Sequence, residues 1–152
     1  MKNIIYSLFI FILSFNFSSV IFANELVNYE IVDLEIPSPL TSSPGDPGLG
    51  KKIAISRSGN CLACHELPNM EKLFHGNIGP SLAGVGNRYN IGELRLRIVN
   101  PYIINSNTIM PAFYKVKGLN RVDKKYLGKT ILNAQEIEDI IAWLLTLKDE
   151  ME

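Results

Sequence analysis

The spacing of apolar residues near the end of the chain predicts an amphipathic helix over about residues 134–147. Asn133 and Glu136 stand three positions apart at its start, as in a capping box. Trp143 and Leu147 fall at the margin of an apolar face whose members repeat at helical spacing, namely Ile137, Ile140, Ile141, Leu144 and Leu145. A face this broad indicates a helix that packs on a core.

A second helix is predicted to begin at Asp46. This residue is a good N-cap, and Pro47 suits the first helical turn. The helix is expected to continue until Gly59 stops it. Glycine costs about 1 kcal/mol relative to alanine inside a helix. Gly48 or Gly50 is therefore expected to permit a close backbone approach.

A third, shorter helix is predicted between these two. Asn90 and Glu93 have capping spacing at its start, and Pro101 ends it just after Val99. The three helices indicate an all-α fold class, and the length of 152 residues supports one compact domain, placed at residues 46–149.

The first 23 residues have the pattern of a cleavable secretory signal peptide. Lys2 precedes an apolar run over residues 4–15, and Ala23 stands at a plausible cleavage point. The alternative is an uncleaved membrane anchor, because a bilayer-spanning helix needs about 20 apolar residues. Cleavage predicts a periplasmic protein.

Residues 24–45 are expected to form an extended arm. Val27, Tyr29 and Ile31 alternate with polar positions, and prolines and a glycine follow before the first helix. The sequence leaves open whether this arm packs on its own domain or on a partner.

The formal charges balance, with 15 Lys+Arg against 15 Asp+Glu, and this neutrality argues against nucleic-acid binding. The charges are nevertheless unevenly spread. Residues 115–129, here called the basic connector, hold one acidic residue and six basic ones, Lys115, Lys117, Arg121, Lys124, Lys125 and Lys129. We expect some of them to lie at the edge of the functional site, where they would steer an acidic partner; the alternative is a solvated loop whose charges only maintain solubility.

The strongest chemical signal is the pentapeptide Cys61-Leu62-Ala63-Cys64-His65. Two thiols two residues apart, followed by histidine, are the attachment motif of a covalent c-type haem, and His65 would be an axial iron ligand. A redox dithiol or half of a zinc site is the alternative for a Cys-x-x-Cys pair. The zinc reading is disfavoured because the chain holds no second cysteine pair.

The sixth iron ligand is predicted to be Met110. It lies 45 residues after His65, far enough for a loop to reach the opposite face of the haem. Met70 stands too close to His65 for this role, and Met151 lies at the chain end. His75 is a weaker candidate.

Two further residues are predicted to support the haem. The carbonyl of Pro80 is expected to accept a hydrogen bond from the ring nitrogen of His65 that does not face the iron. Arg88 is a candidate partner for a haem propionate, the alternative being a surface arginine.

These motifs together resemble the SoxX family of cytochrome subunits of the sulfur-oxidising system. The resemblance covers about residues 46–147 and includes four strings, Gly59-Asn60-Cys61-Leu62-Ala63-Cys64-His65, Ile78-Gly79-Pro80-Ser81-Leu82, Met110-Pro111-Ala112-Phe113-Tyr114 and Ala134-Gln135-Glu136-Ile137-Glu138-Asp139. The resemblance implies a class I cytochrome c-like fold, in which the first and last helices cross beside one haem.

The resemblance also implies a role and partners. In that family a SoxA cytochrome forms a heterodimer with SoxX, and the complex, an L-cysteine S-thiosulfotransferase, oxidatively couples thiosulfate to a cysteine of the SoxYZ carrier. The catalytic haem belongs to SoxA. A non-catalytic subunit with both axial positions filled, by His65 and Met110, would pass electrons to a downstream cytochrome. The alternatives are a free-standing electron carrier and a haem enzyme with a displaceable methionine.

Overall fold

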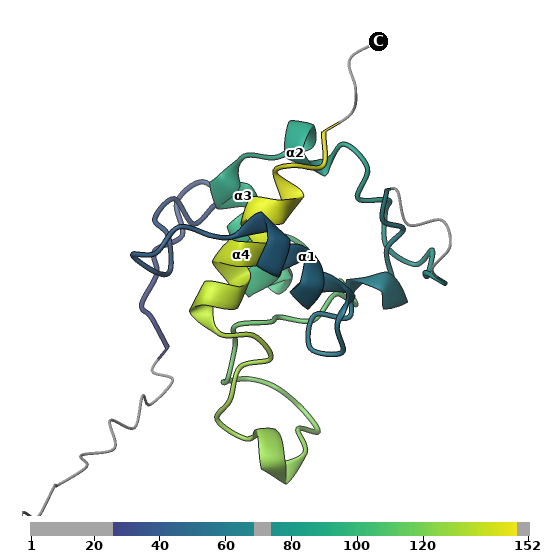
Figure 1. Ribbon diagram of the computed structural model, residues 1–152. Coiled ribbons are helices and arrows are strands. Elements are labelled where there is room, and N and C mark those ends of the chain that lie inside the picture. The colour runs from purple at the N-terminus through teal and green to yellow at the C-terminus, as the bar shows by residue number, and fades with distance from the viewer. Residues whose placement is uncertain (1–25, 69–73, 149–152) are drawn as a thin grey trace, which may run out of the picture.

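The computed structural model describes residues 26–68 and 74–148 (Figure 1). Within these ranges the chain forms four α-helices, α1 (Pro47–Ile55), α2 (Val85–Arg88), α3 (Ile91–Val99) and α4 (Ala134–Leu144), and three short 3-10 helices, Cys61–Ala63, Pro101–Ile103 and Lys124–Tyr126. The same ranges contain no β-strand, only an isolated bridge between Val32 and Glu35. The all-α class predicted from the sequence is confirmed.

The predicted signal peptide, residues 1–23, lies outside the described ranges. Among the residues that are described, no helix has both the length and the apolar character needed to cross a membrane.

Helix α1 begins as predicted and ends earlier. The Asp46 side chain accepts hydrogen bonds from the backbone N–H groups of Gly48 (2.7 Å) and Leu49 (3.0 Å). The helix stops at Ile55, because the backbone N–H and the hydroxyl of Ser56 both donate to the carbonyl of Ile53. The expected stop at Gly59 was wrong. Gly59 instead permits the following loop to fold back closely against α1.

Helix α4 carries the predicted capping box. Asn133 accepts from the backbone N–H of Glu136 at 2.9 Å, and the Glu136 side chain accepts from that of Asn133 at 2.8 Å. Its buried face includes Trp143, which the sequence pattern placed at the margin and which is only 5% exposed. The helix ends at Leu144, three residues before the predicted end, and the chain continues in turns to Leu147.

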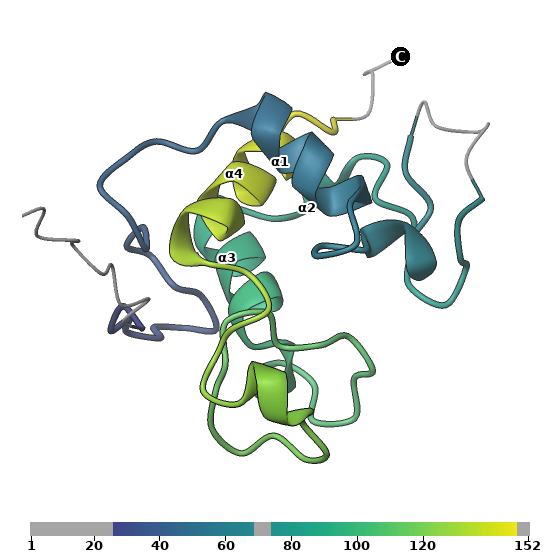
Figure 2. The ribbon, with the colours of Figure 1, turned by 60° about the horizontal axis from the view of Figure 1, so that its bottom comes forward.

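Helices α1 and α4 cross in close contact (Figures 1 and 2). A Cβ atom on Gly50 would overlap the carbonyl group of Asp139, and one on Gly45 would overlap that of Glu138. Gly50 is thus the glycine that permits close approach, whereas Gly48 meets only the side chain of its own cap, Asp46. The crossing helix pair predicted from the resemblance is confirmed.

Helix α3 lies against α4 and is bounded as predicted. Asn90 and Glu93 form a second capping box, and the helix ends at Val99, just before Asn100 and Pro101. Leu94, Leu96, Ile98 and Val99 of this helix belong to the same buried core as α4.

A buried ion pair joins α3 to α4. Arg95, 1% exposed, donates from Nε and Nη2 to the two carboxylate oxygens of Glu138, at 2.7 and 2.9 Å. The pair also holds the arm, because Nη1 of Arg95 donates to the carbonyl of Ile36 (2.5 Å) and the backbone N–H of Leu40 donates to Glu138 (2.9 Å). An isolated buried charge is expensive, and this arrangement satisfies both charges.

The described part of the arm, residues 26–45, packs on its own domain. Ile36 and Leu40 are buried in the core, the Ile36 N–H donates to the carbonyl of Gly92, and the Val27 N–H donates to the hydroxyl of Tyr114. The question left open by the sequence is thereby answered for these residues.

The crossing makes a prediction about stability. We expect Gly50→Ala to lower the free energy of unfolding by about 1–3 kcal/mol, because the added methyl group must push α1 away from α4. Gly48→Ala, in the same helix, is the matched control and should leave stability unchanged or slightly raised, because alanine favours the helix. Denaturant titration of the two purified holoproteins measures both. Equal effects would contradict a tight crossing at Gly50.

Candidate functional site

A cavity of about 700 Å³ opens between the haem motif and the helical core. Helices α3 and α4 line it with Leu94, Ile98, Ile140 and Leu144, and the loops add Ile78, Leu82, Phe113 and Leu132. This volume lies within the range of sites that enclose a cofactor-sized molecule. The mainly apolar walls suit a flat, hydrophobic group.

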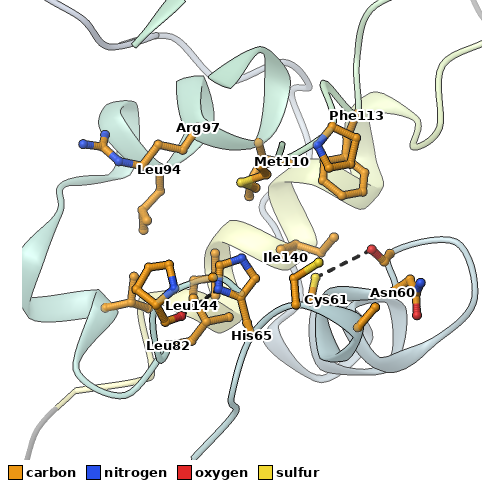
Figure 3. Close-up of a pocket in the computed structure, with 18 of the residues that line it drawn as sticks. Asn60, Cys61, His65, Leu82, Leu94, Arg97, Met110, Phe113, Ile140 and Leu144 are labelled. Atoms are coloured by element: carbon orange, nitrogen blue, oxygen red, sulfur yellow. Dashed lines mark hydrogen bonds between the residues drawn. The ribbon is translucent and has the colours of Figure 1, made fainter. Parts of the chain in front are cut away.

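Both cysteines line this cavity. The 3-10 turn begins at Cys61, and the backbone N–H groups of Cys64 and His65 both donate to the Cys61 carbonyl, at 3.1 and 2.9 Å. Figure 3 shows the Cys61 thiol beside the cavity, with Sγ 3.8 Å from the carbonyl oxygen of Gly59. Burial raises the pKa of the Cys61 thiol to about 11, so before haem attachment it stays protonated at neutral pH.

His65 is held from the loop that follows the haem motif. Its Nδ1 lies 2.7 Å from the carbonyl oxygen of Pro80. A carbonyl only accepts, so Nδ1 donates this hydrogen bond, and in that tautomer of the neutral ring Nε2 is the nitrogen able to bind a metal. A Cβ atom on Gly79 would overlap the imidazole ring, which shows that the backbone lies close against it. The expected pairing of His65 with Pro80 is present, and iron ligation stays a prediction.

Met110 lies across the cavity from His65 (Figure 3). Its backbone N–H donates to the hydroxyl of Thr108 at 3.2 Å. Of the other candidates for sixth ligand, His75 is exposed and absent from the lining, while Met70 and Met151 lie outside the described residues. Met110 is thus the methionine that the described structure brings to the cavity.

Arg88 lines the cavity and is engaged with the backbone. It donates from Nη1 to the carbonyl of Ala83 and from Nη2 to that of Ser81 at 2.9 Å. Its contact with a propionate stays a prediction.

Arg97 and Tyr89, which also line the cavity, were not predicted from the sequence. The signal was present, because Leu94, Arg97 and Ile98 are spaced to share one face of α3.

The described residues hold no other candidate metal site. Residues 26–68 and 74–148 contain no group of three or more His, Cys, Asp or Glu side chains that could hold an ion. None of the six basic residues of the basic connector lines the cavity. Residues just outside the connector do line the cavity, Phe113 before it and Ile131 and Leu132 after it.

Comparison with known proteins agrees with this geometry. Residues 49–148 match the family model described as Cytochrome c. The chain belongs to the cytochrome c family. A cytochrome c domain implies a covalently bound haem c, and the cavity fits that group through its paired thiols, oriented imidazole and apolar walls.

This cytochrome c is also similar to a chain in the crystal structure of SoxXA from P. pantotrophus. The two have 39% sequence identity and a TM-score of 0.71, and the match covers 80% of this chain and 95% of that chain. The resemblance to SoxX stated from the sequence is confirmed. No curated protein matched this cytochrome c.

The assignment of Met110 has a spectroscopic test. Replacing a thioether ligand with imidazole favours ferric over ferrous haem, so we expect Met110→His to lower the reduction potential while keeping the iron six-coordinate. Met110→Leu should remove the sulfur-to-iron charge-transfer band of the ferric spectrum. Met70→Leu is the control and should retain that band. If Met70→Leu lost the charge-transfer band and Met110→Leu kept it, the assignment of Met110 would be wrong.

Proposed function

We propose that this cytochrome c is the electron-transfer subunit of a periplasmic SoxAX complex. Cys61 and Cys64 would attach one haem c, with His65 and Met110 as the axial ligands. The complex would oxidatively couple thiosulfate to a cysteine of the SoxYZ carrier. The catalytic haem would lie on the SoxA partner, and this chain would pass the electrons to a downstream cytochrome.

The arrangement of His65 and Met110 on opposite sides of one apolar cavity carries this proposal. Ligands on both faces leave no position for a substrate at the metal, which favours electron transfer over catalysis. When bound, the haem supplies a reversible one-electron change at its iron. The protein contributes the fixed His65 ring, held by Pro80 and Gly79, and walls that limit the access of water.

The surface around the cavity supports a resident partner. Three isoleucines of its lining are exposed, Ile78 at 67%, Ile109 at 72% and Ile131 at 49%. A bound haem would cover the parts of these side chains that face the cavity, and the parts beyond the haem edge would form an apolar rim of the kind found in stable protein interfaces. Together with the likeness to the SoxXA chain, they support a SoxA-type subunit at this edge.

Coexpression with a SoxA-type subunit tests the proposal. We expect the two holoproteins to elute together from size-exclusion chromatography. We also expect Ile109→Asp, in samples that keep the covalent haem and the methionine band, to weaken the complex at least tenfold in dissociation constant, because a charge would be buried in an apolar contact. Leu49→Asp, at an exposed site on α1, is the control and should bind as the wild type does. Separate elution of the wild-type proteins would favour the free-standing carrier.

The basic connector supports a second, transient partner. In both ribbon views it projects away from the helical core (Figures 1 and 2), and its charged side chains are exposed apart from Lys115, which is half-buried and lies 5.6 Å from the centre of the Tyr102 ring. Because residues on both flanks of the connector line the cavity, Phe113 before it and Ile131 and Leu132 after it, a partner attracted to the connector would arrive near the cavity.

Small charged oxidants test this steering without the natural acceptor. We expect ferricyanide, an anion, to oxidise the ferrous protein at a rate that falls as salt rises, and Lys117→Glu with Lys124→Glu to slow this reaction severalfold at low salt. Lys51→Glu with Lys52→Glu on α1 matches the change in net charge and should have a smaller effect. Cationic tris(phenanthroline)cobalt(III) should show the opposite trends. Equal effects of the two double variants would contradict local steering.

A further inference from the structure

Within residues 26–68 and 74–148, the charged residues of the cavity lining are all of one sign. They are two arginines, Arg88 and Arg97, and no aspartate or glutamate of these ranges lines the cavity. A haem carries two carboxylates, so a pocket that binds it has two negative charges to neutralise. This inference rests on the haem binding implied by the family and concerns which of the two arginines meets those carboxylates.

Arg97 is held in place by two neighbouring residues of the chain, Tyr89 and Glu93. Its guanidinium carbon lies 3.8 Å from the centre of the Tyr89 ring, within stacking distance, and Nη1 donates to the carbonyl of Glu93, one turn back on α3, at 3.0 Å. Neither of the ion pairs among the described residues involves Arg97. Its charge is therefore without a carboxylate in that part of the chain, and a stacked guanidinium presents a fixed, planar set of donors.

Arg88 is engaged differently. Its two terminal nitrogens donate to the carbonyls of Ala83 and Ser81, in the loop whose Pro80 carbonyl accepts from His65. These bonds brace the loop that orients the imidazole. They also use the two nitrogens with which an arginine forms its strongest bidentate contacts.

The covalent attachment limits where the carboxylates fall. Thioether bonds at Cys61 and Cys64 fix the vinyl edge of a haem, and its carboxylates lie on the other side of the macrocycle. In Figure 3 the Arg97 guanidinium and the Cys61 thiol lie on opposite sides of the cavity.

We propose that Arg97, held by Tyr89, is the principal partner of the haem carboxylates, and that Arg88 acts as a positioning residue for the Pro80 loop. A cation at this place favours the ferrous state, since the added electron makes the haem more negative. Arg97 therefore raises the reduction potential as well as fixing the cofactor.

Two measurements on the holoproteins test this assignment, namely potentiometric titration and the propionate bending band in resonance Raman spectra. We expect Arg97→Gln to lower the midpoint potential and shift the band. Arg97→Lys keeps the charge and should recover most of the potential, even if Arg97→Gln folds poorly. Tyr89→Leu should change the midpoint potential and the band position in the same direction as Arg97→Gln does, but to a smaller extent. Tyr89→Phe keeps the stacked ring and should resemble the wild type.

Arg57→Gln is the matched control, because it removes the same charge from an exposed residue outside the cavity lining. Equal effects of Arg57→Gln and Arg97→Gln on both measurements would overturn the proposal. A larger band shift in Arg88→Gln than in Arg97→Gln would also overturn it and assign the carboxylates to Arg88. Only variants that keep the covalent haem and the methionine band are compared. Either of these two results would therefore overturn the assignment of Arg97 and leave the proposed function standing. A wild-type protein without covalent haem would instead refute that function.

Discussion

The crossing of α1 over α4 at Gly50 fixes the geometry of the haem cavity. At this point only a glycine fits against the backbone of Asp139, so the two helices have a fixed register. The chain leaves α1 at Ile55 and reaches Cys61 within six residues, while α4 lines the cavity through Ile140 and Leu144. A shift of α1 along α4 would therefore move the attachment motif relative to one wall of its own pocket.

A short backbone ladder then closes the site around His65. The N–H of Gly76 donates to the carbonyl of Leu62, that of Gly79 to Cys64 and that of Leu82 to Glu66, at 2.8, 2.8 and 3.0 Å. These bonds tie the loop after the haem motif to the motif itself, which aligns the Pro80 carbonyl with the imidazole. The orientation of the His65 ring thus depends on main-chain contacts of the loop.

The sequence predicted what depends on neighbours along the chain. The caps at Asp46, Asn90 and Asn133 are local, because the side chain and the N–H groups that it accepts from are at most three residues apart. The attachment motif is local for the same reason.

Contacts between residues far apart in the chain were harder to predict from the sequence. The sequence pattern gave no sign that Glu138 is buried, and only its ion pair with Arg95, 43 residues away, explains a carboxylate that is 5% exposed. Trp143 was placed at the margin because periodicity shows only the apolar face of its own helix, whereas the buried cluster that includes Trp143 also contains residues of the arm and of α3. Arg97 was missed because its role depends on its contact with Tyr89 and on its position in the cavity wall. Neither can be predicted from the helical spacing of residues.

The uneven distribution of charge gives this nearly neutral chain an acidic segment and a separate basic one. Residues 26–46 hold four acidic residues, Glu30, Asp33, Glu35 and Asp46, and no basic one, whereas the basic connector carries six basic residues and one acidic. A molecule with no net charge is not drawn as a whole toward an anionic partner, but separated charges orient it as the partner approaches. Because such forces fade beyond roughly 10 Å at 0.1 M salt, the nearer surface determines the encounter. Residues that flank the basic connector, Phe113 before it and Ile131 after it, line the cavity together with Met110, so under the proposed function an acidic acceptor that the connector orients would approach the molecule near that side of the cavity.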